Sequence, residues 1–531
     1  MKVGVLELKK SDCGGQTMKR VIALLLTVVA IISAMIGSAC VKGLSEEDKK
    51  NSLIIEVHSA GYGTDWIDFM AKEFQKKTGK KVIVTYQVGG QGLTTMAANI
   101  ESLTSDTDLF FMGGASVTEV YKGQVTVRGQ SYSCIYEDLT DLYKTKIEGE
   151  DVTVEQKMLE SSRTALITDN KYYHFPYVSG MQGFIINKDV WNSAWEIPRT
   201  TNELLELCET IKGSGKSPFI YSLEDEYWTT MLPVFVSQYE GVENMNKLWS
   251  GYGPDGKRYS NNMIAYTGLL KALEFFHSLL VDSNGYMYRD SKDVSFTNMQ
   301  SMFLEGAAVM NCNGDWLEKE MFTNYPEVEI EMMKTPVLSA VAEKCSFSGD
   351  ADKETKLRTL IDYVDGVITE KPSFATDDDV AYIREARSFE RAGSGNCAVI
   401  PCYANQKQSA KDFLLFMASN EGLKIFRDYT AGCRMPFDYS GIPTRENETT
   451  FRKSVIKIMD GAVNGGARKK DKIFTLGEIN PYFYNNKFGR FVSVFAASNP
   501  KDYKNALQYF TEEVSSVNSL LTNAKIKAGL N

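Results

Sequence analysis

The sequence is poor in the residues and motifs that mark metal and catalytic sites. It has only three histidines, His58, His174 and His277, and they stand far apart. Its nine cysteines form no C-x-x-C pair and no zinc-binding spacing. The signatures of a serine nucleophile (G-x-S-x-G), of a zinc peptidase (H-E-x-x-H) and of a nucleotide-binding P-loop are absent as well. We therefore expect no metal, no cofactor and no catalytic residues, although sequence spacing alone does not exclude a pair of carboxylates as in glycosidases.

Positive charge is also scarce relative to negative charge. The 531 residues carry a formal net charge of −9, and the basic residues form no cluster, so nucleic acid is not expected as a partner. The hydrophobic share of 43% and the charged share of 24% are those of ordinary globular proteins. The length indicates more than one lobe with ample core.

The N-terminal region reads as an export signal. Residues 18–39 combine Lys19 and Arg20 with a long apolar run and then small residues, and Cys40 follows. We predict a lipoprotein signal peptide with lipidation at Cys40; the alternative is a plain transmembrane anchor. Residues 1–17 contain acidic residues and make a poor signal start, so we expect Met18 to be the true start. Residues 40–52 are the lipid anchor and a flexible tether.

The cysteines in the rest of the chain number seven, because Cys13 and Cys40 fall in this N-terminal region. An odd number gives no complete pairing. Most are expected to be reduced core residues, and a Cys397–Cys402 pair stays open.

The chain after residue 52 begins with an alternating strand and helix pattern. Strands are expected at 53–58, 81–88 and 108–112, with helices after the first two. This order predicts a parallel sheet covered by helices. Gly89, Gly90 and Gly92 are interpreted as a turn after the second strand, where the backbone either comes close to a ligand or simply turns. Their spacing does not match a dinucleotide-binding fingerprint.

The stretch Phe296–Met321 has the pattern of a functional corner. It predicts a helix that ends at Gly306, a strand over 307–310, a turn over 311–314 and a second helix from Trp316. Asp315 and Glu318 are spaced as a capping box. A Trp at this place packs in the core, or it forms a ligand platform at the end of a strand.

Several segments resemble bacterial extracellular solute-binding proteins, the group that includes maltodextrin-binding proteins. They are the corner at Trp316, the strand pair in Lys171–Trp191, the aromatic stretch 226–230 and the segment Ala398–Phe426. The order of these segments carries the resemblance. Departures are Ile186, where the family has Tyr, and Asn202, where it has Trp. The resemblance implies a periplasmic-binding-protein-like α/β fold, with two α/β lobes joined by a multi-strand hinge and a ligand cleft between them.

The resemblance also implies domain limits. Lobe one is expected to comprise 53–178 plus 337–440, with an insertion at about 340–396, and lobe two to comprise 179–336 plus 441–531. The strand pair in 171–191 is expected to be the first crossing between the lobes, and Met333–Ser339 the second.

The resemblance implies a sugar or oligosaccharide as the ligand. In such a site aromatic rings stack on the faces of the sugar, while carboxylates and amides hydrogen-bond to its hydroxyl groups. By alignment with the family, Trp316 and Tyr227 are the expected stacking residues. The full set of candidate ligand-binding residues, all at presumed cleft-facing loops or element ends, is Tyr62, Asp65, Gln91, Gly114, Tyr177, Tyr227, Trp228, Asn313, Asp315, Trp316 and Arg434.

The function implied is that of a monomeric substrate-binding lipoprotein, on the outer face of the membrane, which hands its ligand to an ABC permease. Three alternatives stay open. The same fold can bind a peptide, polyamine or anion; the chain can be an extracellular carbohydrate-active enzyme; or it can present its ligand to a membrane sensor.

Overall fold

The computed structural model describes residues 45–59, 61–113, 124–168, 170–224, 227–393, 395–465, 490–497 and 504–530. The predicted start, signal peptide and lipidation site at Cys40 lie outside the described residues, as does Gly114. The flexible tether predicted for 40–52 is wrong where the structure describes it, because residues 46–51 form a helix whose Asp48 pairs with Lys81 at 2.6 Å. Within the described ranges, no helix combines the length and the apolar composition needed to cross a bilayer.

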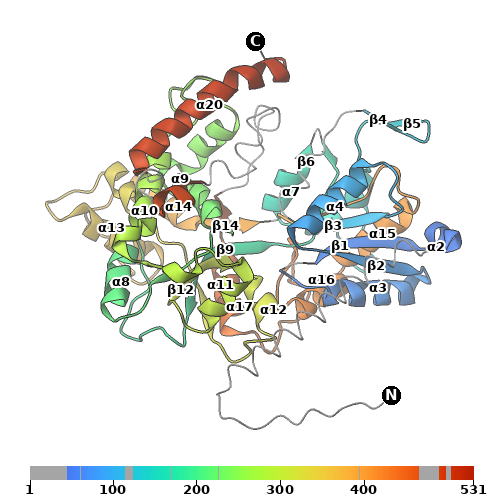
Figure 1. Ribbon diagram of the computed structural model, residues 1–531, viewed down its shortest axis with the longest axis horizontal. Helices are drawn as coiled ribbons and strands as arrows, with labels where there is room; N and C mark the ends of the chain where they lie inside the picture. Colours follow the sequence, from blue (N-terminus) through green and yellow to red (C-terminus); the bar gives the residue numbers. More distant parts are fainter. Residues whose placement is uncertain are drawn as a thin grey trace, which may run out of the picture.

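The chain forms two α/β lobes that lie side by side, each built on its own sheet (Figure 1). The sheet of lobe one has the strand order β2-β1-β3-β15-β8. The sheet of lobe two has the order β11-β10-β12-β9-β14-β16, with β13 paired to the end of β9. This is the expected two-lobed α/β architecture.

The elements of lobe one are α2 (Glu46–Asn51), β1 (Leu53–Ser59), α3 (Asp65–Thr78), β2 (Val82–Val88), α4 (Gly89–Glu101), β3 (Leu109–Met112), β4 (Val125–Val127), β5 (Gln130–Tyr132), α5 (Thr140–Lys144), α6 (Val154–Lys157), α7 (Glu160–Leu166), β6 (Ile167–Thr168), β7 (Lys171–Tyr172), β8 (Phe175–Pro176), β15 (Cys397–Val399), α15 (Lys407–Ala418) and α16 (Asn420–Tyr429).

The elements of lobe two are β9 (Gly180–Asn187), α8 (Thr201–Gly213), β10 (Phe219–Ile220), α9 (Tyr227–Trp249), α10 (Thr267–Leu280), η2 (Asp282–Asn284), β11 (Met287–Tyr288), η3 (Arg289–Ser291), α11 (Phe296–Leu304), β12 (Met310–Gly314), α12 (Leu317–Met321), β13 (Ile330–Met333), η4 (Ser339–Lys344), α13 (Lys353–Val364), α14 (Asp377–Ser388), β14 (Phe389–Gly393), α17 (Thr450–Met459), β16 (Val463–Asn464), α19 (Phe491–Phe495) and α20 (Ala506–Ala528).

Lobe one follows the periodicity of its sequence. β1 pairs in parallel with β2 and with β3, and its residues 53–57 are buried. The apolar side chains spaced along α3 are buried against this sheet, as their helical spacing predicts. One detail differs: the glycines at 89–92 were expected to form a turn, but they form the first turn of α4. Gly89 supplies the positive φ, 66°, at which the strand turns into that helix.

Three adjacent chain segments connect the lobes. The first joins β8 to β9, the second joins β14 to β15, and the third runs from α16 to α17. Their backbones are hydrogen-bonded to one another: the Tyr177 N–H donates to the Asn396 carbonyl (3.2 Å), and the Ser179 N–H donates to the Arg434 carbonyl (2.7 Å). A few backbone torsions at such a junction allow rigid lobes to move relative to each other.

The second crossing and the insertion are not where the sequence led us to expect them. Met333–Ser339 stays within lobe two, where it follows β13 and enters η4. The insertion at 340–396 belongs to lobe two rather than lobe one, because α13 and α14 pack in the core of α9 and α10, and β14 pairs with β9. The buried face of these helices is apolar and needs a partner, and lobe two supplies it.

All seven cysteines in the described ranges are buried free thiols. The Cys397–Cys402 pairing that the sequence left open is therefore not formed. Burial raises the pKa of Cys397 to about 12 and of Cys402 to about 11, so both remain thiols at neutral pH.

A buried carboxyl group joins β14 to the segment that follows β13. Glu390 in β14 is 1% exposed. Its carboxyl accepts hydrogen bonds from the backbone N–H of Thr335 (3.1 Å) and from the Thr335 hydroxyl. Burial raises its pKa from 4.5 to about 7, although the hydrogen bonds from Thr335 oppose the shift. The folded protein therefore holds this proton at a pH where the unfolded chain has released it.

We predict that Glu390 makes the protein less stable as pH rises from about 4.5 to about 7, because ionisation costs the folded state and not the unfolded state. Glu390→Gln keeps a polar partner for Thr335 without the ionisation. As pH rises from 4.5 to 8, the free energy of unfolding of the variant should increase relative to that of the native protein by on the order of 3 kcal/mol, measured by urea unfolding. Glu46→Gln, at an exposed carboxylate, is the control, and an equal gain in both variants would contradict the assignment.

Candidate functional site at the interface of the two lobes

Three aromatic residues from distant parts of the sequence meet where the lobes touch. Tyr62 lies in the loop after β1, Tyr227 is the first residue of α9, and Trp316 lies between β12 and α12. The Trp316 ring contacts Tyr62 edge-on, with centroids 6.1 Å apart, and contacts Tyr227 at 5.6 Å. Trp316 is a lobe-two residue that packs against the core of lobe one. The aromatic cluster therefore spans the interface.

A buried carboxylate lies beneath this aromatic cluster. Asp315 is 0% exposed, and its Oδ2 pairs with the guanidinium of Arg452 at 2.9 Å. Its Oδ1 accepts hydrogen bonds from the Tyr62 hydroxyl (3.2 Å) and from the Met181 N–H (3.3 Å). Burial, followed by the negative charge of Asp315, raises the pKa of Tyr62 well above its ordinary value, so the phenol keeps the proton that it donates.

Glycines allow these side chains to come together. A Cβ on Gly180, the first residue of β9, would lie 2.5 Å from the Tyr62 hydroxyl oxygen. A Cβ on Gly314 would lie 2.2 Å from the indole ring of Trp316. Both positions exclude any larger residue unless the aromatic side chains move.

A second set of polar contacts also crosses between the lobes. The Gly61 N–H donates to Glu320 Oε1 at 2.9 Å, and the other oxygen of Glu320 accepts from Gln300 at 3.1 Å. At the rim, Lys319 forms an ion pair with Asp65 at 2.8 Å. Burial raises the pKa of Glu320, while its two donors oppose the shift. Lobe one thus binds α12 through its 61–65 loop.

Three details of the predicted corner are wrong. The strand expected over 307–310 lies further along the chain, because β12 begins only at Met310. Residues 311–314 were expected to form a turn, but they form most of β12, which pairs with β9 from Met310 to Gly314. Asp315 was expected to cap a helix, but α12 begins after Trp316 and has no side-chain cap. The carboxylate of Asp315 is instead used by Arg452, because a buried charge gains more from a guanidinium than from a backbone N–H.

The structure sorts the predicted site residues into three groups. Tyr62, Asp65, Tyr227, Asp315 and Trp316 lie together at the interface. Trp228 and Tyr177 lie in the cores of lobe two and lobe one, at 1% and 4% exposure, so their place as cleft residues is corrected. Trp228 packs on Phe184 and Phe219, because Tyr227 takes the outward position at the start of α9.

The remaining predicted residues lie outside the aromatic cluster. Gln91 is exposed on the first turn of α4. Asn313 is fully buried in β12, and its side-chain oxygen accepts from the Gly314 N–H at 2.7 Å. Arg434 lies on the third crossing, with its guanidinium 5.2 Å from the Tyr439 ring centroid.

Sequence reasoning missed the residues that support the cluster, Arg452 above all. Arg452 shares the buried face of α17 with Phe451 and Val455. A charged residue on the apolar face of a predicted helix is the signal that could have revealed it. Glu320, Gln300 and Gly61 gave no comparable signal, because their contact exists only when two remote segments meet.

We predict that Arg452→Met destabilises the protein by about 3–5 kcal/mol, because it leaves Asp315 buried without its partner. The double variant Arg452→Met/Asp315→Asn should recover part of the loss, since Asp315 is then neutral. The recovery stays partial because Glu318, whose carboxylate lies 3.6 Å from Arg452, still loses its cation. Urea unfolding of the native protein, both single variants and the double variant measures the coupling. Additive losses in the double variant would contradict a direct pairing.

Comparison with known proteins agrees with this architecture. The family model for bacterial extracellular solute-binding proteins matches residues 60–424. One similar solved structure comes from work on xylan utilization by the thermophilic bacterium Caldanaerobius polysaccharolyticus. It is 13% identical, with a TM-score of 0.61, covering 88% of this chain and 100% of that one.

A second similar structure is the solute-binding protein RafE in complex with raffinose. It is also 13% identical, with a TM-score of 0.56, covering 89% of this chain and 100% of that one. No curated protein sequence matches the chain. The family match covers more than half of the sequence. The two similar structures share the fold of this chain. The chain belongs to the bacterial extracellular solute-binding proteins.

Proposed function

We propose that this protein captures a sugar or oligosaccharide between its two lobes and delivers it to the membrane permease of an ABC transporter. The observation that carries the proposal is the aromatic cluster of Tyr62, Tyr227 and Trp316 at the interface, with the buried carboxylate of Asp315 beneath it. Aromatic faces suit the C–H faces of a sugar ring, and a few fixed polar groups suit its hydroxyls. The structural likeness to a raffinose complex supports the same ligand class.

The charges at the interface favour a neutral ligand over an ionic one. Asp315 is paired with Arg452, and Asp65 is paired with Lys319. A polyamine would require carboxylates that are available for it, and an anion would require available cations. The same pairing argues against a glycosidase, whose acid and nucleophile must act on the substrate. We therefore propose binding without catalysis.

Ligand entry requires the lobes to separate. The contacts of Glu320 with Gly61 and of Lys319 with Asp65 join the lobes directly, so opening about the three crossings must break them. A ligand that bridges Trp316 and Tyr62 then favours the closed form, because its contacts to both lobes exist only there. The permease would recognise that closed form. We further propose lipidation at Cys40 and a monomer on the outer face of the membrane.

Thermal unfolding tests the ligand class and the site together. We expect an oligosaccharide from a panel that also contains amino acids, peptides, polyamines and anions to raise Tm by a few degrees. A ligand at about 100 times its Kd stabilises by about 2.7 kcal/mol. Trp316→Ala should abolish the shift. Trp195→Ala, at another half-buried Trp of lobe two, should retain it. A shift produced only by charged ligands would contradict the proposed sugar.

The lobe contact through Glu320 gives a second test. Glu320→Ala removes the acceptor of the Gly61 N–H and frees Gln300, so the ligand-free protein should open more often. We expect a larger radius of gyration in small-angle scattering without ligand, and a loss of sugar affinity of about 3- to 10-fold. Glu331→Ala, at a half-exposed ion pair with Lys188 within lobe two, is the control. An unchanged radius of gyration would show that Glu320 does not hold the lobes together.

A further inference from the structure

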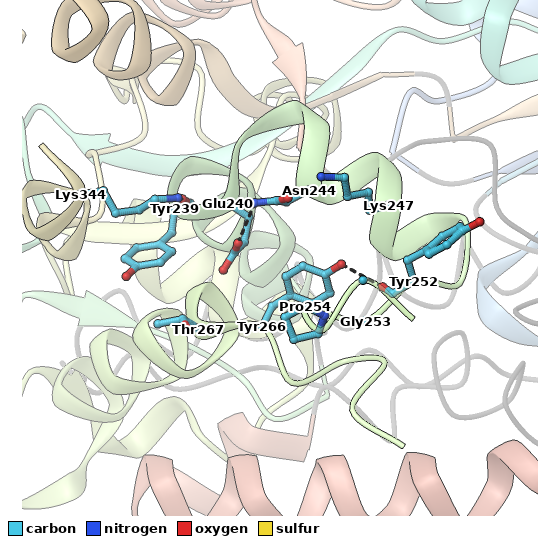
Figure 2. A pocket seen from close by; sticks show the side chains of 11 residues that line it. Tyr239, Glu240, Asn244, Lys247, Tyr252, Gly253, Pro254, Tyr266, Thr267 and Lys344 are labelled. Atoms are coloured by element: carbon cyan, nitrogen blue, oxygen red, sulfur yellow. Dashed lines mark hydrogen bonds between the residues drawn. The ribbon is translucent and has the colours of Figure 1, made fainter. Parts of the chain in front are cut away.

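Lobe two contains a pocket that is separate from the interface between the lobes. Its volume is about 580 Å³, within the usual range for small-molecule sites. It lies between the second half of α9, the loop 250–266, the start of α10 and the end of η4 (Figure 2). Its lining residues are Tyr239, Glu240, Asn244, Lys247, Tyr252, Gly253, Pro254, Gly256, Tyr266, Thr267 and Lys344. We call it the α9–α10 pocket.

The α9–α10 pocket is distant from the aromatic cluster at the lobe interface. Tyr227, at the interface, is the first residue of α9, and Tyr239 follows it by more than three turns of the same helix. At 1.5 Å per residue the two positions are about 18 Å apart. A ligand in the α9–α10 pocket would therefore not touch Trp316, and the two sites can be tested independently.

The polar groups of the pocket are held in place by contacts of their own. The Glu240 carboxylate accepts from the Gly268 N–H at 2.6 Å and from the Asn244 side chain at 3.4 Å, the second bond being drawn in Figure 2. The Lys344 ammonium donates to the Tyr239 carbonyl at 2.7 Å and lies 4.9 Å from the Tyr239 ring centroid. Groups fixed in this way lose little entropy when they bind a ligand.

Two tyrosines of the pocket differ in exposure: Tyr266 is buried and Tyr252 is partly exposed. Tyr266 is 3% exposed and its hydroxyl donates to the Tyr252 carbonyl at 2.8 Å, which ties the start of α10 to the loop (Figure 2). Burial raises the pKa of Tyr266 to about 12, so the phenol is neutral. Tyr252 is 37% exposed, and the Arg258 guanidinium lies 5.8 Å from its ring centroid, so only part of the side chain is open to a ligand.

The composition of the lining indicates the class of ligand. It contains three tyrosines but no Leu, Ile, Val, Met or Phe, so an aliphatic or lipid ligand would find no matching surface. Its charged groups are largely engaged: Glu240 and Lys344 as described, and Lys247 in an ion pair with Glu243 at 2.7 Å. The exposed part of Tyr252, together with fixed amide, hydroxyl, carboxylate and ammonium groups, suits a neutral polyhydroxylated molecule.

We propose that the α9–α10 pocket is a second carbohydrate-binding site, which takes a neutral sugar unit on lobe two outside the lobe interface. Its ligand class is argued from the lining of the pocket itself and does not depend on the function proposed for the interface. Such a site would retain a longer glycan, or the end of one, on the outer surface of the protein.

Hydrogen–deuterium exchange of the full chain measures ligand binding at each of the two sites separately. The probes are maltotriose, xylotriose and raffinose, each at about 20 mM to reach weak sites. We expect at least one of them to slow exchange about threefold in residues 250–268. The loop amides of this segment are hydrogen-bonded, as in the bond from the Gly253 N–H to the Lys257 carbonyl. The protection should persist in Trp316→Ala, which removes the interface site, and should disappear in Tyr252→Ala.

The matched control is Phe69→Ala on lobe one, because Phe69 is 38% exposed and thus similar to Tyr252. It should leave the protection of 250–268 unchanged. The proposal is overturned if none of the three sugars protects this segment, or if inorganic phosphate or spermidine protects it and the sugars do not. Protection of residues 61–68 alone would support the interface site and reject the α9–α10 pocket.

Discussion

The ion pair between Asp315 and Arg452 is the interaction on which the interface depends. Both side chains are almost fully buried, at 0% and 2% exposure, so each charge must be satisfied within the protein. The carboxylate binds Tyr62 of lobe one and the Met181 N–H of β9, while Arg452 also binds the carbonyls of Ala431 and Asp315. One pair of charges therefore joins β9, α17, a crossing segment and lobe one, and Trp316 follows directly in the chain.

Local structure was predictable from the sequence wherever it depends only on residues that are close together in the chain. The apolar spacing of α3, α10 and α11, and the end of α11 at Gly306, follow from side-chain period and glycine chemistry. Trp316 was correctly expected to follow a strand, although that strand, β12, begins at Met310, where the sequence led us to expect its end. These features need no knowledge of what packs against them.

Features that depend on remote partners could not be predicted in this way. Tyr227 and Trp228 are adjacent and chemically alike, but only the packing of α9 decides which one faces the interface and which one the core. The turn expected at 311–314 is a strand because β9 provides its hydrogen bonds. The insertion was assigned to the wrong lobe, since its apolar helix faces show that a partner exists but not which one.

The interleaving of the lobes along the chain has a consequence for how the protein is made. Met112 at the end of β3 pairs with Cys397 in β15, and β14, just before it, pairs back to β9. Lobe one therefore cannot complete its sheet until the part of lobe two from β9 to β14 has been synthesised, and pairings of such long range form slowly. The edge of β3 stays unpaired meanwhile, and such an edge invites aggregation. A protein destined for the outside of the cell gains from this delay, because a chain that folds late remains threadable through an export channel for longer.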